Sequence, residues 1–272
     1  MANLMKNVTL ADGIVIRELA THEDRARAVR LQEVTWGAGF TERVPAAMLL
    51  VGEKLGGVSA GAFTPDGTLV GFVFGLTGLK DGRLVHWSDM LAVTPKVQGR
   101  GIGRALKYYQ RDRCRAIGVE TMYWTFDPFV ARNAQLNLCR LGARVVEFVP
   151  DMYGADTNSP EHGSLGTDRL VAAWPVSAEA VPLPSGGEAL RGAPVVAGRR
   201  GDALAPGATL PDATAVTVRV PADYHALLAN DLELAREWRM SARRAFLHYL
   251  SRGYQVSAFS AAGGDAAYLL TR

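Results

Sequence analysis

Short apolar runs separated by turn residues dominate the first 175 positions of the chain. Three of these runs follow one another closely, and Asp-Gly turns at 66–67 and 81–82 lie between them. Apolar runs joined by such turns predict consecutive strands in a meander. Strands are expected in this region at 14–19, 58–63, 69–76, 84–93, 122–126, 144–149 and 169–174.

Helices are predicted between these strands. The first begins after Thr21, a favourable N-cap residue with Asp24 three positions further on. The second opens at Pro45, because proline is well tolerated in the first turn of a helix. Two more are expected at 101–117 and 132–141. The resulting order, β-α-α-β-β-β-α-β-α-β-β, indicates a mixed α+β fold.

The rest of the chain changes character twice. Residues 176–213 are rich in Ala, Gly and Pro, and we interpret them as a linker with one short strand at 195–196. Regular patterning then returns. It predicts a strand at 216–220, a helical stretch from 221, a long helix at 232–250, and two strands at 254–259 and 267–270. We therefore expect a domain at 1–175, the linker, and a small β-α-α-β-β extension at 214–272. An extension of this size is marginal as an independent fold, so it should dock onto the first domain or onto a partner chain.

An anion-binding turn is predicted where the fourth strand meets the third helix. The strand ends at residues 91–95, and Q-x-x-G-x-G at 98–103 leads into a helix rich in Arg and Lys. Free backbone N–H groups at a helix N-terminus bind phosphates, and glycines let the backbone approach them closely. Arg100, Arg104 and Lys107 can add positive charge. A Walker loop is excluded because no Lys-Ser or Lys-Thr follows, and the dinucleotide fingerprint fails on its spacing.

The glycine motif and the Leu-Ala-Val-x-Pro strand end before it resemble motif A of the GNAT superfamily of acyl-CoA-dependent N-acyltransferases. The element order over residues 10–175 is similar to that family as well. The resemblance implies a GNAT fold, a mixed and mostly antiparallel sheet whose fourth and fifth strands splay apart. Acetyl-CoA or another acyl-CoA would lie in the gap as co-substrate. Its pantetheine arm would pair with the strand end, and the turn amides would hold its pyrophosphate, with Gln98 bracing the turn. The implied cofactor-binding residues are Leu91, Ala92, Val93, Gln98, Gly99, Arg100, Gly101, Ile102, Gly103, Arg104 and Asn133.

A second run of letters resembles one branch of this family. W-T-F-D-P at 124–128, R-N-A at 132–134 and L-G-A at 141–143 are similar to a branch that carries a C-terminal extension. Some of its members resemble enzymes that N-succinylate amino acids. The acyl group is therefore expected to be acetyl or succinyl, and the acceptor a small-molecule amine such as an amino acid. The loop at 150–167 is expected to line the acceptor site. The carboxylate of an amino acid would need an arginine fork, for which the candidates are Arg43, Arg132 and Arg169.

Acyl transfer to an amine needs a base and an oxyanion donor, and it benefits from an acid. A backbone N–H near 91–93 is the simplest oxyanion donor. On the fourth strand, alternation places the even-numbered residues of 86–91 on one face and the odd-numbered ones on the other. Many relatives place a carboxylate base on this strand, which favours Asp89, with His86 as the alternative. Asp127, at the end of the fifth strand, is a further candidate as a base, an ammonium ligand or a turn residue.

The resemblance also implies an acid, usually a tyrosine, at a helix position that Leu138 occupies in this chain. Leucine has no proton to donate, and Tyr153 is the candidate replacement. A CoA thiol, with a pKa close to the cysteine value of about 8.5, can also leave as a thiolate near neutral pH.

Composition narrows the choice of partners. The 272 residues are 48% apolar, enough for a substantial core, and the net charge of +3 provides no broad basic field for nucleic acid. The two cysteines, Cys114 and Cys139, are too few for a disulfide framework and indicate a reduced, cytoplasmic protein. We expect no signal peptide, no membrane span and no metal site.

An enzyme is the leading hypothesis. The alternative is a non-catalytic, regulatory acyl-CoA-binding module, which Leu138 in the acid position would suit. Nucleic-acid binding by the arginine-rich helix near 236–252 is the weakest hypothesis, since Glu233 and Glu237 interrupt its charge. The extension is expected to support a homodimer or the acceptor pocket rather than to bind CoA.

Overall fold

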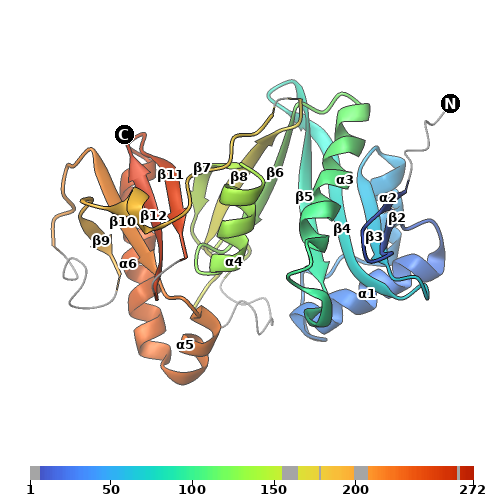
Figure 1. The fold of residues 1–272 in the computed structure, drawn as a ribbon, viewed down its shortest axis with the longest axis horizontal. Helices are drawn as coiled ribbons and strands as arrows, with labels where there is room; N and C mark the ends of the chain where they lie inside the picture. The colour runs from blue at the N-terminus through green and yellow to red at the C-terminus, as the bar shows by residue number, and fades with distance from the viewer. Residues whose placement is uncertain (1–6, 155–164, 178, 199–207, 262–263) are drawn as a thin grey trace. The chain divides into compact units, whose positions relative to one another are not determined.

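The structure is a computed structural model that describes residues 7–154, 165–177, 179–198, 208–261 and 264–272 (Figure 1). The described residues form two compact units. One contains residues up to Trp124 together with those of 175–179, and the other contains those of 125–174 and 180–272.

The first unit is built on a sheet with the strand order β1-β2-β3-β4-β5-β6. These neighbours are antiparallel except β5 and β6, which are parallel. The strands are β1 (Val8–Thr9), β2 (Val15–Glu18), β3 (Val58–Phe63), β4 (Leu69–Lys80), β5 (Arg83–Val93) and β6 (Thr121–Phe126). The Asp-Gly turn between β4 and β5 places Asp81 and Gly82 at positive φ, which matches the mirror-image turns that join twisted strands.

Helices α1 (His22–Trp36), α2 (Ala46–Lys54) and α3 (Ile102–Ala116) complete this unit. The Thr21 hydroxyl accepts a hydrogen bond from the Asp24 amide, and the Asp24 carboxylate accepts one from the Thr21 amide, so α1 begins with a capping box. Pro45 is the N-cap residue of α2, so the helix begins one position after the predicted start. Phe72, Phe74 and Met90 of the sheet pack with apolar residues of α1 and α2 in one buried cluster.

The second unit contains an antiparallel pair and a separate sheet. The pair is β7 (Arg144–Val149) and β8 (Arg169–Pro175), and the separate sheet has the order β11-β12-β10-β9. Its strands are β9 (Val195–Ala197), β10 (Ala215–Val220), β11 (Gln255–Ser260) and β12 (Ala266–Thr271). The helices are α4 (Ala131–Ala134), α5 (Tyr224–Asn230) and α6 (Leu232–Leu250). A π-helical segment, η2 (Gln135–Arg140), continues α4, and 3-10 turns lie at η1 (Pro95–Val97) in the first unit and η3 (Gly187–Leu190) in the second.

The fold class is as predicted, a mixed α+β fold with a mostly antiparallel main sheet and a second small sheet near the C-terminus. All the predicted strands are present within a few residues of their expected bounds, and the two-residue β1 was not predicted. The compact units divide after Trp124, whereas we expected a boundary near residue 175.

The C-terminal residues pack with the residues between β6 and β8 inside the second unit. Phe148 of β7 stacks on Phe246 of α6, with ring centroids 5.3 Å apart. The Tyr268 hydroxyl donates a 2.7 Å hydrogen bond to the Pro128 carbonyl. The extension therefore docks onto part of the predicted first domain, one of the two arrangements we expected. In the described part of the chain, none of the helices is long and apolar enough to cross a membrane.

Candidate active site

The turn before α3 presents backbone amides to solvent. Gly99 and Gly101 have φ near +80°, and a Cβ added at either would meet nothing within 4 Å. Gly101 is the N-cap residue and provides no side-chain oxygen for the first turn of α3. Those N–H groups can therefore bind an anion. The Gln98 side chain donates a 2.8 Å hydrogen bond to the Val93 carbonyl, which braces the turn as predicted. Arg100 is exposed beside it.

The other predicted cofactor residues divide by exposure. Ile102 is buried and anchors the first turn of α3, whereas Gly103 is half-buried and Arg104 is exposed, with its guanidinium 5.2 Å from the Tyr108 ring centre. On β5, Ala92 is buried and its neighbours Leu91 and Val93 are half-buried. Asn133 lies in α4, in the second unit, and is half-buried.

A β-bulge at Asp89 changes the faces of β5. Phe74 pairs with Met90 while the next residue, Gly75, pairs with Ser88, so Asp89 has no counterpart on β4. Because Phe74 and Gly75 point to opposite faces, Met90 lies on the face opposite Ser88. Our prediction of simple alternation over 86–91 is therefore wrong beyond Ser88.

Asp89 is exposed at this bulge. The surrounding protein still removes part of the water around its carboxylate, which raises its pKa, and the negative charge of Glu42 raises it further. A carboxylate with a raised pKa that projects from a bulge is a suitable general base for an ammonium substrate.

Strands β5 and β6 pair over a short distance. The register runs from Val85 with Thr121 to Trp87 with Tyr123, whereas β5 continues to Val93. The parallel strands thus form a fork whose first residues beyond the last pair are Ser88 and Trp124. This matches the splay expected of the fourth and fifth predicted strands.

Lys107 of α3 reaches this fork instead of the anion-binding turn where we expected its charge. Its ammonium donates a 2.7 Å hydrogen bond to the Ser88 hydroxyl and lies 3.9 Å from the centre of the Trp124 ring. The residue is only 2% exposed, and burial lowers its pKa to about 7. The sequence signal that we missed is its spacing from Gln110 and Cys114, which places all three on one helix face.

His86 is fully buried on the same face of the sheet as Ser88. The Thr77 hydroxyl donates to the Gly56 carbonyl, so its oxygen accepts from Nδ1–H of His86 at 3.0 Å. The other ring nitrogen, Nε2, then accepts from the Gln110 amide at 3.0 Å. Burial, aided by the charge of Lys107, lowers the pKa of His86 to about 3, so the ring is neutral. Both nitrogens are engaged inside the protein, which disfavours the role of a base toward a ligand.

Asp127 lies in a buried ionic cluster of the second unit. One carboxylate oxygen accepts from the Phe129 amide at 2.8 Å, and the other accepts from Arg239 of α6 at 2.9 Å and lies 3.6 Å from Arg169. Burial alone would raise the pKa of Asp127, but the two guanidiniums lower it below its usual value. A carboxylate held in this way is a weak base. Arg169 is likewise engaged, which removes it as a ready fork for a substrate carboxylate.

Tyr153 and Leu138 also lie in the second unit. The Tyr153 hydroxyl is 3.0 Å from the hydroxyl of Thr125, a residue of β6, and the side chain is half-buried. Leu138 is fully buried within the π-helical segment. The Tyr153 hydroxyl thus has a polar neighbour, whereas Leu138 packs in the interior. Residues 155–164 of the loop expected to line the acceptor site lie outside the described residues.

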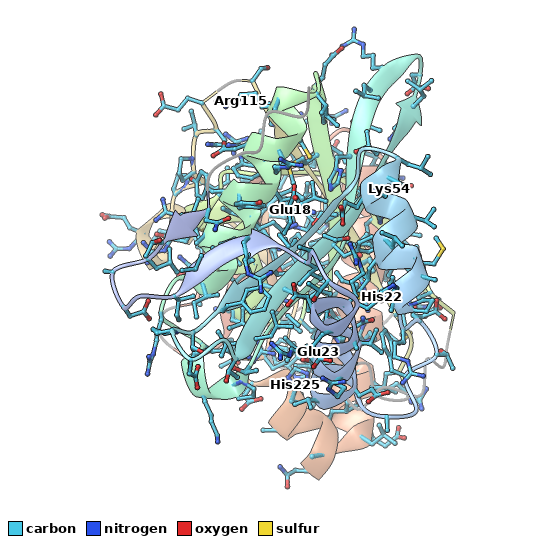
Figure 2. The ribbon with its side chains drawn as sticks, turned by 90° about the vertical axis from the view of Figure 1, so that its right-hand side faces the viewer. Glu18, His22, Glu23, Lys54, Arg115 and His225 are labelled. Atoms are coloured by element: carbon cyan, nitrogen blue, oxygen red, sulfur yellow. The ribbon has the colours of Figure 1, made fainter. Side chains whose placement is uncertain are left out.

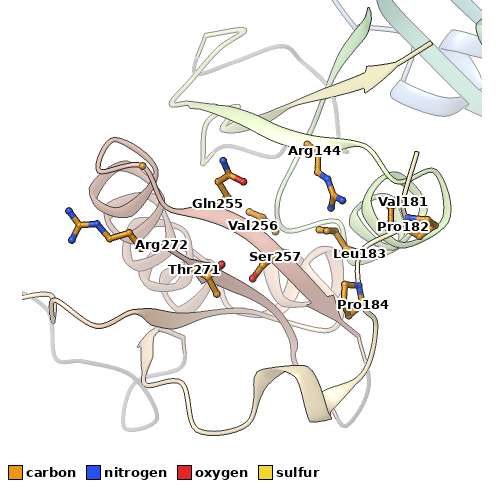
Figure 3. A pocket seen from close by; sticks show the side chains of 11 residues that line it. Arg144, Val181, Pro182, Leu183, Pro184, Gln255, Val256, Ser257, Thr271 and Arg272 are labelled. Atoms are coloured by element: carbon orange, nitrogen blue, oxygen red, sulfur yellow. The ribbon is translucent and has the colours of Figure 1, made fainter. Parts of the chain in front are cut away.

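A surface pocket in the second unit lies between Arg144 and strand β11, where Gln255 and Ser257 point toward it (Figure 3). None of the predicted site residues lines it. Among the described residues, no group of His, Cys, Asp or Glu side chains could hold a metal ion.

Comparison with known proteins connects these features to a family. The sequence model of the Acetyltransferase (GNAT) family matches residues 42–143, which include the anion-binding turn, the bulge and the fork. No protein of curated function matches the chain.

Several solved acetyltransferase structures are similar to this chain over part of its length. The ribosomal-protein-S18-alanine N-acetyltransferase from Escherichia coli is 20% identical, has a TM-score of 0.48 and covers 63% of this chain and 99% of its own. The phosphinothricin acetyltransferase from Sinorhizobium meliloti, in complex with AcCoA, is 17% identical, has a TM-score of 0.49 and covers 60% of this chain and 88% of its own. Neither likeness carries information on the substrate of this chain. The match of the GNAT family model to residues 42–143 is thus the finding that supports an acyl-CoA-dependent enzyme.

Proposed function

We propose that the protein is an N-acyltransferase that moves an acyl group from acyl-CoA to the amine of a small molecule. The observation that carries the proposal is the connection between two features. The solvent-facing amide turn at the start of α3 follows directly on β5, and β5 leaves its parallel neighbour at Trp87. One extended cofactor could therefore place its phosphates on the turn and its amide-bearing arm along β5.

In this proposal, the amides from Gly99 to Arg104 bind the pyrophosphate, and Leu91, Ala92 and Val93 offer backbone groups to the pantetheine. Asn133 is kept as a further ligand of the pantetheine. An amide of the strand end would stabilise the oxyanion as the amine attacks the thioester carbonyl.

Asp89 is the base that we propose, because it is exposed at the bulge and has a raised pKa. His86 and Asp127 are proposed to act through structure, since their polar atoms are engaged in the interior. Tyr153 remains a candidate acid beside Thr125. Asp89→Asn should lower kcat with little change in the KM for acyl-CoA, and Asp66→Asn, an exposed turn carboxylate, is the matched control.

The acyl group and the acceptor belong to the proposal too. Acetyl and succinyl are the two acyl groups that we propose, with an amino acid among the acceptors. Arg43, Arg132 and Arg169 stay the proposed candidates for an arginine fork. Arg43 pairs with Glu33 and Arg169 lies near Asp127, so either of these would exchange a protein carboxylate for that of the substrate. We further propose a cytoplasmic location and a homodimer. Size-exclusion chromatography with light scattering would test the homodimer.

The direct experiment measures CoA release with a thiol reagent. Acetyl-CoA and succinyl-CoA are each offered with L- and D-amino acids, polyamines and aminoglycosides. Turnover that depends on the amine supports the proposal. The second candidate, a regulatory acyl-CoA-binding module, is favoured by the buried Leu138 in the expected acid position. Tight CoA binding without turnover on any amine would select it.

A further inference from the structure

Lys107 lies at the apex of the fork between β5 and β6. Its ammonium contacts the first residue of β5 beyond the last strand pair, Ser88, at 2.7 Å. It also contacts the ring of the first residue of β6 beyond that pair, Trp124, at 3.9 Å from the ring centre. The side chain thus brings a cation to the point where the two parallel strands cease to pair.

The surroundings of this cation are unusual for a buried lysine. The titratable groups that face it are His86 on β5, which is neutral, and Cys114 on its own helix, whose thiol pKa burial raises to about 12. No carboxylate is among its contacts or electrostatic partners in the part of the chain that the structure describes. The Ser88 hydroxyl and the Trp124 ring satisfy two of its three N–H directions.

Packing alone does not account for such a residue. An ammonium that is removed from water without a carboxylate partner destabilises the folded state, and a methionine or leucine would fill the same space without that penalty. A buried cation of this kind points to a role toward negative charge that arrives with a ligand.

We propose that Lys107 is a catalytic residue that donates a proton to the CoA sulfur as the thioester breaks. The inference rests on the proposed function, which places the arm of acyl-CoA in this fork. The amine nitrogen forms a bond to the acyl carbon, and the carbon–sulfur bond breaks with its electron pair on sulfur. One Nζ proton of Lys107 moves to that sulfur, which yields CoA thiol, an amide and a neutral lysine amine. The base takes the proton released by the attacking nitrogen, and Lys107 regains its own from solvent.

The direction of this transfer is favourable. With the pKa of Lys107 at about 7 and that of a thiol near 8.5, the proton prefers the thiolate by roughly 30-fold. Before the transfer, the ammonium would also stabilise the charge that develops on sulfur.

The test is the pH dependence of kcat at saturating acyl-CoA and amine, measured on the full chain from pH 6 to pH 9. Calorimetry first confirms that CoA binds to the wild-type protein. Because Lys107 must carry its proton to act as the acid, wild-type kcat should fall as the pH rises through about 7, and Lys107→Met should lose this dependence. Lys54→Met makes the same chemical change at an exposed position of α2 and should keep the pH dependence of the wild type (Figure 2).

The size of the kcat loss provides a second readout. Lys107→Met should lower kcat at pH 7 at least ten-fold with less than a three-fold change in the KM for acyl-CoA. Ser88→Ala keeps the ammonium but removes its acceptor, so it should show a smaller loss, and it keeps the test informative if the methionine variant does not fold.

The same pH dependence of kcat in wild type and Lys107→Met would overturn the inference while leaving the proposed function standing. A large kcat loss in Tyr153→Phe with none in Lys107→Met would also overturn it. Failure of the wild-type protein to bind CoA would instead remove the proposed function, and the inference with it.

Discussion

Replacing Lys107 by methionine should remove a rise in the free energy of unfolding that the wild type shows as the pH increases above 7. Methionine has a similar length and no charge, so the substitution removes a titrating group while largely filling the same space. In the folded chain the lysine pKa is about 7, whereas in the unfolded chain it returns to about 10.4. Between these values the unfolded state binds a proton that the folded state has released. The free energy of unfolding of the wild type must therefore rise with pH in this window.

The size of this effect follows from the two pKa values. A difference of one bound proton between the unfolded and folded states changes the free energy of unfolding by about 1.4 kcal/mol per pH unit. The folded lysine is half protonated at pH 7 and almost neutral at pH 9, so the wild type should gain about 2 kcal/mol over that range. Below pH 7 both states bind the proton, and the difference between wild type and variant should level off.

Urea unfolding of both proteins at half-unit steps from pH 6 to pH 9 measures this difference. Contributions of other groups that titrate in the window cancel when the free energies of the two proteins are subtracted. A difference that stays constant from pH 7 to pH 9 would refute the reasoning, because Lys107 would then keep an ordinary pKa in the folded state.

Three further predictions concern stability and CoA binding, and two of them use matched controls. The pKa of buried His86 is lowered to about 3, so between pH 6.5 and pH 5 the unfolded histidine takes up a proton that the folded one does not. Over this range the free energy of unfolding of the wild type should therefore fall by about 1.5 kcal/mol relative to that of His86→Leu. A constant difference in urea unfolding would contradict this. Asp127→Asn should cost about 3–5 kcal/mol in the same assay because it removes the nearer carboxylate from the buried Arg239, whose other carboxylate partner, Asp168, lies 4.0 Å away. Asp212→Asn removes the carboxylate of an exposed ion pair with Arg272 and should cost under about 1 kcal/mol. Equal costs for the two variants would show that the buried ion pair contributes no more to stability than the exposed one. Gly101→Ala and Gly118→Ala each place a methyl in open space at positive φ and should each cost about 1–2 kcal/mol. Only the Gly101 variant should weaken CoA binding in calorimetry, and equal weakening in both would contradict the anion site.

The sequence allowed the fold to be predicted because its strands and caps depend on local patterns. Short apolar runs and Asp-Gly turns identified β3, β4 and β5, and Thr21 with Asp24 marked the start of α1. The glycines at 99–103 identified the amide turn, because positive φ is favourable only for glycine.

The arrangement of the site was harder to predict because it depends on tertiary contacts. The bulge at Asp89 contains neither glycine nor proline, so simple alternation misassigned Met90. Asp127 looked like a catalytic carboxylate because its partner, Arg239, lies 112 positions further along the chain. Lys107 looked like a phosphate ligand because its sequence neighbours are basic, and only the packing of α3 shows that it points to the fork.

The most direct test of the central claim is amine-dependent release of CoA by the full chain, measured with a thiol reagent and repeated with Gly101→Ala. Our account predicts turnover of acetyl-CoA or succinyl-CoA with at least one small-molecule amine, and reduced turnover at low acyl-CoA concentration in the variant. Release that does not depend on any amine, or a variant that matches the wild type at every acyl-CoA concentration, would contradict it.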